Sequence, residues 1–505
     1  MRIIDCHVHP EPVSDYKAAL AKLIRHGKAH RIQHMIASDL GDWKAYPSAD
    51  TLRKANDTLR EAAASSQGYF SYLVYLNPQL ENFQEELARH AESACGVKLW
   101  ISLRSPQTGS LERSIRVLQA AAEMHKAVLI HCLDRTAKSL PGEVSLEDII
   151  ALAEAVPQCT IVMAHAGGNW RKCIALSSGI PSKVVMDLSG TNPERTMVRR
   201  LVDTFGAERI LYGSDGPYRS FASQLSKVLQ AGLSAEEEDL ILFRNAARIF
   251  RIPESVAETM PRTPLPEPDL DQHLRGEDHF CFTGSALQYF DHAVSVRDLH
   301  EEGVKHRIRS LYAVNLHSLE TGDLLKANRS YLEEVRNYPL IRPLATVDLR
   351  QKEQSFAQLG EMQGFAGIWI TPYLHDYELD YREYAAFFDL CAERKIKLWI
   401  NTALSDDRFR KETLKTRPVS NQAIETFVRS APVNFYCFQG LLPFPEMGKI
   451  FPDHCFAEYS RLADREYAIY GLLRENPEIL SRLLRGSEYP FRYYDTVDNC
   501  LSGRW

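Results

Sequence analysis

The sequence predicts an α/β protein built from two tandem (β/α)8 barrels of the TIM type, the second of them degenerate. Its 505 residues are too many for one domain, because a single hydrophobic core stops growing at ~250–300 residues. The first half alternates eight apolar, strand-like segments with helical patterns, which favours a closed barrel over an open doubly wound sheet. The second half repeats short motifs of the first in the same order, which indicates a duplication.

The eight predicted strands of the first barrel are short apolar runs, most of which end in polar residues. They cover residues 2–7, 34–38, 69–76, 97–103, 127–132, 160–165, 184–188 and 209–214. Helical periodicity between them is clearest at residues 111–124, 146–155 and 235–250. The last of these helices ends the first domain, which we place at residues 1–252.

A proline-rich linker is predicted at residues 253–275. This segment contains five prolines, and each proline removes a backbone donor and restricts φ, so we expect an extended connector. Residues 276–505 form the second domain, whose motifs follow those of the first at an interval of about 270 residues. GKAHRI at 27–32 resembles GVKHRI at 303–308, KAN at 54–56 recurs at 326–328, GVKL at 96–99 resembles GIWI at 367–370, and LIH at 129–131 resembles WIN at 399–401.

The composition excludes several classes of protein. With 45% hydrophobic and 25% charged residues, the chain is typical of a globular protein and not of a disordered or fibrous one. The net charge of −6 is spread along the chain, so nucleic acid is not an expected partner, and no apolar run is long enough to span a membrane. Sparse cysteines without C-x-x-C pairs and a start without a secretory signal predict a cytoplasmic location.

Histidines and an aspartate stand where the predicted strands end. His7 and His9 lie two apart on the first strand, so their side chains share a face. His131 ends the fifth strand, His165 the sixth, and Asp215 follows the eighth. The carboxyl ends of barrel strands meet at one rim, where active sites form. Imidazoles with a carboxylate suit Zn²⁺ or a similar divalent ion with one position open for water.

These residues resemble the amidohydrolase superfamily, and in particular its branch that includes aminocarboxymuconate-semialdehyde decarboxylase and related hydrolases. The resemblance covers residues 1–252 and rests on D-x-H-x-H at 5–9, His131, AHAGG at 164–168, GSD at 213–215 and the closing FRNAARIF at 243–250. It implies that His7, His9 and His131 bind a metal ion and that Asp215 is a further ligand and the proton shuttle. It also implies that His165 binds a second metal or contacts hydroxide and substrate.

Four further residues are candidates for the same site. Lys98 stands where some superfamily members carry a carboxylated lysine between two metals. We favour a single divalent ion, with zinc first and manganese or another ion as alternatives, so that Lys98 binds an anionic substrate or pairs with a nearby carboxylate. Arg104 and Arg135 could hold a carboxylate by paired hydrogen bonds, and Tyr218 could line the pocket.

The second domain lacks these ligands. In the alignment on the HRI motif, the predicted equivalents are Thr283 and Ser285 for His7 and His9, Trp369 for Lys98, Asn401 for His131, Gln439 for His165, and a leucine of YGLL at 470–473 for Asp215. We therefore expect no metal chemistry in this domain. We expect a domain that keeps its core after losing its chemistry to supply an interface, so a homo-oligomer through the second barrel is a candidate assembly.

The predicted function is hydrolysis of an amide, lactone or ester of a small molecule by metal-activated water. Non-oxidative decarboxylation of an unsaturated or aromatic carboxylic acid uses the same ligands and is the alternative. A non-catalytic binding or scaffold protein with a structural metal is the alternative from another class. The substrate itself is not predicted, because specificity resides in the loops.

Overall fold

A computed structural model describes most of the chain. The described residues are 1–11, 16–43, 47–100, 111–136, 140, 142–190, 194–257, 276–404, 408, 411, 413–440, 452–458, 460, 476–494 and 496. The chain divides into two units, Met1–Pro266 and Glu267–Arg504. The predicted linker lies outside the described residues from position 258 onward. None of the described helices is long and apolar enough to cross a membrane.

Eight parallel strands form the sheet of the first unit, in sequence order around the barrel. They are β1 (Ile4–Val8), β2 (His34–Ala37), β3 (Phe70–Tyr75), β4 (Gly96–Leu99), β5 (Ala127–Ile130), β6 (Ile161–Met163), β7 (Val184–Asp187) and β8 (Ile210–Leu211). The first strand bonds to the segment that contains the last, through Cys6 N to Tyr212 O (3.1 Å) and His9 N to Gly216 O (2.8 Å). The predicted (β/α)8 barrel is therefore confirmed.

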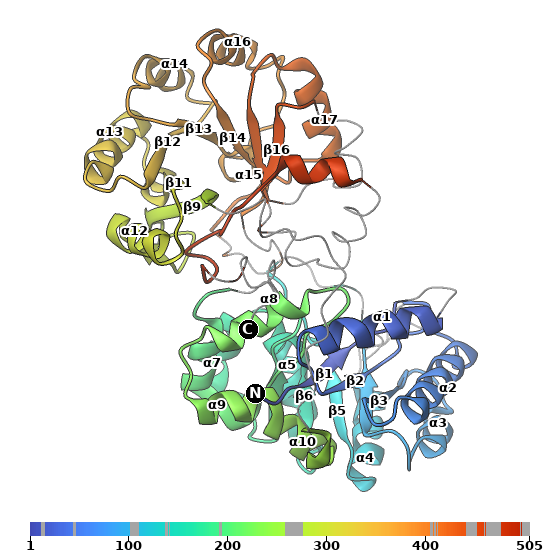
Figure 1. Ribbon diagram of the computed structural model, residues 1–505. Helices are drawn as coiled ribbons and strands as arrows, with labels where there is room; N and C mark the ends of the chain where they lie inside the picture. The colour runs from blue at the N-terminus through green and yellow to red at the C-terminus, as the bar shows by residue number, and fades with distance from the viewer. Residues whose placement is uncertain are drawn as a thin grey trace. The chain divides into compact units, whose positions relative to one another are not determined.

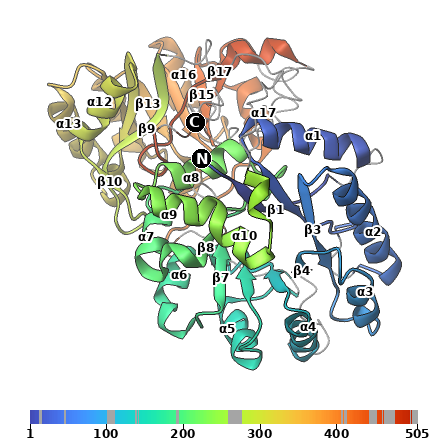
Figure 2. The ribbon, with the colours of Figure 1, turned by 60° about the horizontal axis from the view of Figure 1, so that its bottom comes forward.

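Helices surround these strands (Figure 1), and Figure 2 shows α4, α5 and α6 on the outside of the barrel. They are α1 (Tyr16–Ala29), α2 (Ala49–Ser65), α3 (Phe83–Arg89), α4 (Glu112–Glu123), α5 (Leu146–Ala155), α6 (Trp170–Ala175), α7 (Met197–Phe205), α8 (Phe221–Leu229), α9 (Ala235–Asp239) and α10 (Asn245–Phe250). Ser48, Ser145, Ser220 and Ser234 cap the starts of α2, α5, α8 and α9 by accepting from a backbone amide of the first turn, which explains where these helices begin. The predicted helix 235–250 is interrupted by a π-helical turn at Leu240–Arg244.

The core of the first unit lies inside the barrel. Alternate strand residues such as Ile4, Leu129 and Val162 point inward and are fully buried, and Phe243 and Phe250 of the closing helical segment pack against them. This arrangement follows from the two-residue period of strands. The apolar layers therefore leave the carboxyl ends of the strands for polar side chains.

The second unit contains a second ring of parallel strands, with a short antiparallel strand beside the first one. The strands are β9 (Glu277–Ser285), β10 (Ala293–Val294), β11 (Ser310–Asn315), β12 (Ile341–Val347), β13 (Gly367–Ile370), β14 (Leu398–Asn401), β15 (Tyr436–Gln439), β16 (Cys455–Glu458) and β17 (Leu483–Leu484). Main-chain bonds from His279 N to Arg485 O (2.8 Å) and from Phe282 N to Tyr489 O (2.9 Å) join the first strand to the last segment.

Among the described residues of this unit, six α-helices lie between its strands along the chain. They are α12 (Val296–Lys305), α13 (Leu324–Val335), α14 (Lys352–Gly360), α15 (Pro372–His375), α16 (Ala385–Glu393) and α17 (Asn421–Ser430). Aromatic residues dominate the core here, with Phe280, Phe282, Trp369, Trp399 and Phe491 in one buried cluster.

The two units repeat the same internal hydrogen bonds. Asn56 on α2 donates to the Tyr75 carbonyl (3.0 Å) and accepts from the Tyr75 amide (2.9 Å). Asn328 on α13 makes the same pair of bonds to Thr346 (2.9 and 3.1 Å). Both asparagines are buried, so each ties a helix to the neighbouring strand. This recurrence supports the hypothesis of a duplication.

Candidate metal centre

Three predicted ligands converge at the rim of the first barrel. His7 lies on β1 and His9 directly follows this strand, and their Nε2 atoms lie 3.2 Å apart. Asp215 follows β8 and places Oδ1 3.5 Å from His9 Nε2 and 4.0 Å from His7 Nε2. The His7 and His9 side chains are 1% and 3% exposed, whereas that of Asp215 is 22% exposed. The cluster is therefore shielded from solvent except at the carboxylate.

The four candidate histidines each use one ring nitrogen for an outer hydrogen bond. The bonds join His7 Nδ1 to Asp187 Oδ2 (3.0 Å), His9 Nδ1 to the Ser38 carbonyl (2.7 Å), His165 Nδ1 to the Ser189 carbonyl (3.1 Å) and His131 Nε2 to Glu143 Oε1 (3.1 Å). Carbonyl and carboxylate oxygens only accept, so each of these nitrogens carries the hydrogen. The other nitrogen of each ring then offers a lone pair.

The lone pairs of these rings face each other in two pairs. His7 Nε2 lies 3.2 Å from His9 Nε2, and His131 Nδ1 lies 3.2 Å from His165 Nε2. Facing lone pairs repel unless a cation or a hydrogen-bond donor lies between them. Outer hydrogen bonds that orient imidazoles in this way are typical of metal ligands, so the residues present fit a divalent ion.

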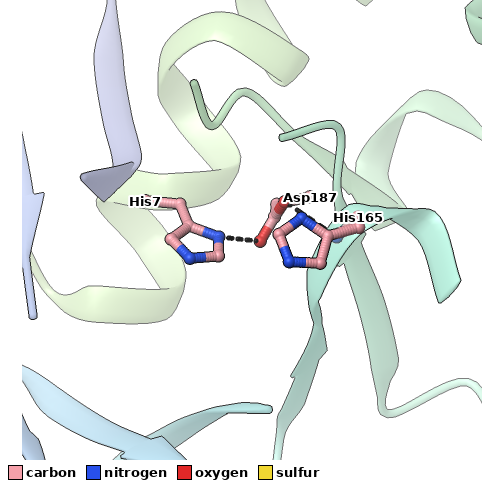
Figure 3. A group of neighbouring side chains, drawn as sticks. All are labelled: His7, His165 and Asp187. Carbon is pink, nitrogen blue, oxygen red and sulfur yellow. Dashed lines mark hydrogen bonds and ion pairs between the residues drawn. The ribbon is translucent and has the colours of Figure 1, made fainter. Parts of the chain in front are cut away.

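Asp187 is a residue of this site that the sequence analysis does not identify. It ends β7, and its carboxylate lies between the His7 and His165 rings (Figure 3). Oδ2 lies 3.0 Å from His7 Nδ1, and Oδ1 accepts from the His165 amide (3.1 Å). Burial alone would raise the pKa of Asp187, but His7, His165 and the hydrogen bond from Ser189 together outweigh burial and hold that pKa well below its usual range. The only signal in the sequence was an acidic residue at the end of a predicted strand.

The backbone around the cluster has unusual conformations. His165 and Asp215 have φ values of 61° and 63°, in the left-handed region that side chains with a Cβ seldom adopt and that recurs at functional sites. Gly190 lies against both: a Cβ there would be 2.4 Å from His165 Nδ1 and 3.1 Å from Asp215 Oδ2. A glycine is therefore needed where the chain after β7 passes these two side chains.

Lys98 joins the cluster from β4. Its Nζ lies 2.9 Å from His7 Nε2, and the residue is 1% exposed. Burial lowers the pKa of Lys98 to about 8, although Asp187 and Asp215 oppose this shift. The lysine thus lies where the resemblance implied, while the single metal ion, with Lys98 left for an anionic substrate or a nearby carboxylate, stays a prediction.

The candidate substrate residues have different surroundings. Arg135 points its Nε and Nη2 at the Glu143 carboxylate, each at 3.0 Å. Tyr218 is 38% exposed, and its ring centroid lies 6.5 Å from that of His9. Arg104 lies outside the described residues. Tyr218 thus borders the cluster directly, whereas Arg135 is bonded to another side chain of the protein.

Three aromatic residues, Trp43, Trp100 and Tyr218, form an aromatic wall beside the histidines. Trp43 contacts Tyr218 and Trp100 edge to face, with centroid distances of 4.7 and 5.7 Å. The wall reaches the cluster through Trp43 and His9 (5.4 Å) and through Trp100 and His131 (6.4 Å). Such a surface favours contact with a flat, unsaturated group.

The first-strand equivalents that we predicted for the second unit are wrong. Asp5 Oδ1 accepts from the amide of His7 (3.1 Å), and Asp278 Oδ1 accepts in the same way from Phe280 (3.1 Å). His7 therefore corresponds to Phe280 and His9 to Phe282, instead of Thr283 and Ser285. The shift arises because 25 residues separate positions 278 and 303 (303 − 278), against 22 between positions 5 and 27 (27 − 5).

Two later equivalents are also corrected. The Gly440 amide donates to Glu458 (2.9 Å) as the His165 amide donates to Asp187, so Gly440, not Gln439, corresponds to His165. The eighth strand of the second unit is β17, so the residue in the place of Asp215 is Glu488. The predicted equivalent, a leucine of the segment 470–473, lies outside the described residues.

Trp369 and Asn401 take the places of Lys98 and His131, as the alignment indicated. Among the described residues, the clusters of ligand atoms that could hold a metal are both in the first unit. Self-association through the second barrel stays a prediction.

The first unit matches a known protein family. Residues 4–252 match the amidohydrolase family model, whereas a search among curated proteins found no match. Similar solved structures include 5-carboxyvanillate decarboxylase from Sphingomonas paucimobilis, with 16% identity, 50% of this chain and 99% of that chain covered, and a TM-score of 0.39. A proposed 2-pyrone-4,6-dicarboxylic acid hydrolase from Pseudomonas putida has 23% identity, 50% and 97% coverage, and a TM-score of 0.38.

A third similar structure is a dihydroxybenzoic acid decarboxylase from Polaromonas with bound manganese and the inhibitor 2-nitroresorcinol. It has 16% identity, covers 49% of this chain and 96% of that chain, and has a TM-score of 0.38. The family match spans the whole first barrel, including all five rim residues His7, His9, His131, His165 and Asp215. Through residues 4–252, the first barrel belongs to the amidohydrolase family.

Proposed function

We propose that the first barrel is a metal-dependent hydrolase that directs water at an amide, lactone or ester of a small molecule. The observation that carries this proposal is the position of Asp215. Its Oδ1 faces the Nε2 atoms of His7 and His9, and its side chain is the most exposed of the three. A carboxylate beside a metal site and open to a substrate has the position that a general base requires.

His7, His9, His131 and Asp215 would hold one divalent cation, with zinc the favoured occupant for a set of imidazole and carboxylate ligands. A bound cation of this kind polarises a carbonyl group and lowers the pKa of water to ~7. Manganese is the alternative, because it suits carboxylate and water oxygens such as those of Asp215 and of water at the open position.

The side chains then have distinct tasks. Asp215 accepts the proton of the attacking water and returns it to the leaving group. His165, whose Nδ1 is bonded to the Ser189 carbonyl, directs Nε2 toward the cluster and contacts the substrate there. The aromatic wall packs against the substrate and keeps bulk water out, which strengthens electrostatic interactions in the site.

Decarboxylation of an unsaturated or aromatic carboxylic acid is the second candidate function. The aromatic wall favours it, because Trp43, Trp100 and Tyr218 offer ring faces and edges next to the histidines. A flat conjugated acid would stack there with its carboxylate near the cluster. The ligand set is the same for both reactions, so the substrate decides between them.

The test begins with protein stripped of metal by a chelator and reloaded with zinc or manganese. We expect about one ion per chain by elemental analysis, and turnover that returns only after reloading. The substrate panel contains aryl esters, unsaturated lactones, anilides and hydroxybenzoic acids. His7→Ala should lose the ion, and His317→Ala, an exposed histidine of the second unit, is the matched control.

Each outcome has a definite meaning. Release of an acid from an ester, lactone or amide supports hydrolysis, and release of CO₂ from an acid supports the second candidate. One tightly bound ion without turnover on any substrate would favour a structural metal in a binding protein. Equal metal content in His7→Ala and His317→Ala would refute the proposed site.

A further inference from the structure

We propose that Glu143 is a positioning residue that orients His131 for metal binding and is itself held by Arg135. This inference rests on the proposed function, because it assumes that His131 is a metal ligand. Glu143 follows His131 by 12 residues, in the loop after β5, and its side chain is 0% exposed. Its Oε1 lies 3.1 Å from His131 Nε2.

Each oxygen of the Glu143 carboxylate accepts two hydrogen bonds. Oε1 accepts from His131 Nε2 and from Arg135 Nη2 (3.0 Å). Oε2 accepts from Arg135 Nε (3.0 Å) and from the backbone amide of Leu140 (2.8 Å). A buried carboxylate with four donors has one orientation, because any rotation would break bonds that water cannot replace.

That orientation determines which nitrogen of His131 is available. With Nε2–H donating to Glu143, Nδ1 carries the lone pair, and Nδ1 is the atom that lies 3.2 Å from His165 Nε2. The carboxylate also makes the ring a stronger base, as outer partners of metal-bound histidines do. Without Glu143, the ring could rotate or take the other tautomer, in which Nδ1 has no lone pair.

The structure assigns Arg135 to holding Glu143 in place and not to binding a substrate carboxylate. Its Nε and Nη2 groups both donate hydrogen bonds to the Glu143 carboxylate, and the Arg135 side chain is only 19% exposed. A bidentate guanidinium–carboxylate pair is a rigid unit. Arg135 therefore supports His131 through Glu143.

Glu143→Gln is the main test, with zinc affinity of the metal-free protein as the readout. We expect affinity to fall 10–100-fold, the usual effect of removing an outer partner of a ligand. The chain offers a matched control in Glu86, whose carboxylate lies 2.6 Å from Arg89 and 3.3 Å from His90 but on α3, outside the barrel. Glu86→Gln should leave zinc affinity unchanged.

Arg135→Met provides a second test that does not depend on Glu143→Gln being well folded. We expect a smaller loss of zinc affinity, and no further loss when Arg135→Met is added to Glu143→Gln, because both act through one bond. Unchanged zinc affinity with a raised KM in Arg135→Met would instead assign Arg135 to substrate and overturn its role here. The tautomer of His131, read from the ¹⁵N shifts of its ring, should change in Glu143→Gln.

Failure of this inference is distinct from failure of the proposed function. Wild-type zinc affinity in Glu143→Gln, together with loss of zinc in His131→Ala, would overturn the role of Glu143 and leave the metal site intact. Wild-type affinity in both His131→Ala and His7→Ala would overturn the metal site, and the role of Glu143 with it.

Discussion

Asp5 connects the two segments that carry the proposed metal ligands. Its Oδ1 accepts from the backbone amides of His7 (3.1 Å) and Ser214 (3.0 Å), and the residue is fully buried. The residue after Ser214 is Asp215, so one carboxylate oxygen aligns β1 with the segment after β8 at the ligands themselves. We predict that Asp5→Ala lowers both stability and metal affinity.

The stability loss follows from the two amides left without an acceptor. An unsatisfied buried group costs ~1–3 kcal/mol, so two of them predict a loss of about 2–6 kcal/mol in the free energy of unfolding. Asp5→Asn retains an oxygen that can accept both bonds. It also removes a carboxyl group whose pKa burial raises to about 7. The free energy of unfolding of Asp5→Asn should therefore stay close to that of the wild type.

The second barrel supplies the control for this prediction. Asp278 Oδ1 accepts from the amides of Phe280 and Ser487, both at 3.1 Å, and Asp278 also pairs with Arg485 (3.2 Å). Asp278→Ala should therefore destabilise at least as much as Asp5→Ala.

Urea unfolding and zinc titration of the metal-free proteins measure the two effects. Only Asp5→Ala should weaken zinc binding. Wild-type zinc affinity in a folded Asp5→Ala protein would refute the reasoning that this carboxylate aligns the ligands.

Three other predictions concern single groups. Asp215→Asn should keep much of its metal but lose turnover ~10²–10⁴-fold, because an amide cannot accept the proton of water; activity within a few-fold of wild type would exclude the shuttle. Arg492→Met removes the ion pair between Arg492 Nε and the buried Glu488 (2.6 Å) and should lower the free energy of unfolding in urea by ~3–5 kcal/mol, against less than ~1 kcal/mol for the exposed Arg297→Met. Burial raises the pKa of Glu458 from 4.5 to about 7, so its protonated form stabilises the fold, and that stability is lost as pH rises from below 4.5 through 7. The free energy of unfolding should fall by about 3 kcal/mol over this range, and Glu458→Gln should remove this part of the pH dependence.

The fold was largely predictable because barrel strands are short apolar runs with a clear rhythm. All eight strands of the first unit occur where apolar runs precede polar residues, and α5 has the predicted bounds, since Ser145 and Asp148 form a capping box there. The interruption at Leu240–Arg244 was not predictable, because a π-helical turn keeps nearly the same apolar pattern as an α-helix.

The site was predictable only where ligands follow a strand pattern. The pair His7 and His9 is visible in the sequence, because alternate strand residues share a face. Asp187 bonds to His7 across 180 residues, and no local pattern distinguishes it from other acidic residues. Glu143 lies in an irregular loop, where there is no sequence periodicity from which a buried residue could be predicted.

The second half shows how short matches mislead. The HRI motifs of the two units do correspond to each other. The segment from the first strand to that motif, however, is three residues longer in the second unit. The YG dipeptide at 470–471 resembles the one that follows β8 in the first unit, but the structure places the eighth strand of the second unit at Leu483–Leu484. Loop lengths are weakly constrained, so spacing between motifs is a poor guide to register.

The amino-acid sequence by itself determined the two-domain α/β architecture, the barrel of the first domain and the residue types that can bind a metal ion. These properties depend on local periodicity, chain length and side-chain chemistry. The tertiary structure alone decided which residues meet: Asp187 between two histidines, Glu143 behind His131, and Phe280 and Phe282 in the second unit where the first has His7 and His9. The physical reason is that hydrogen bonds and ligand clusters join strand ends far apart in the chain, and their geometry exists only once the barrel has closed.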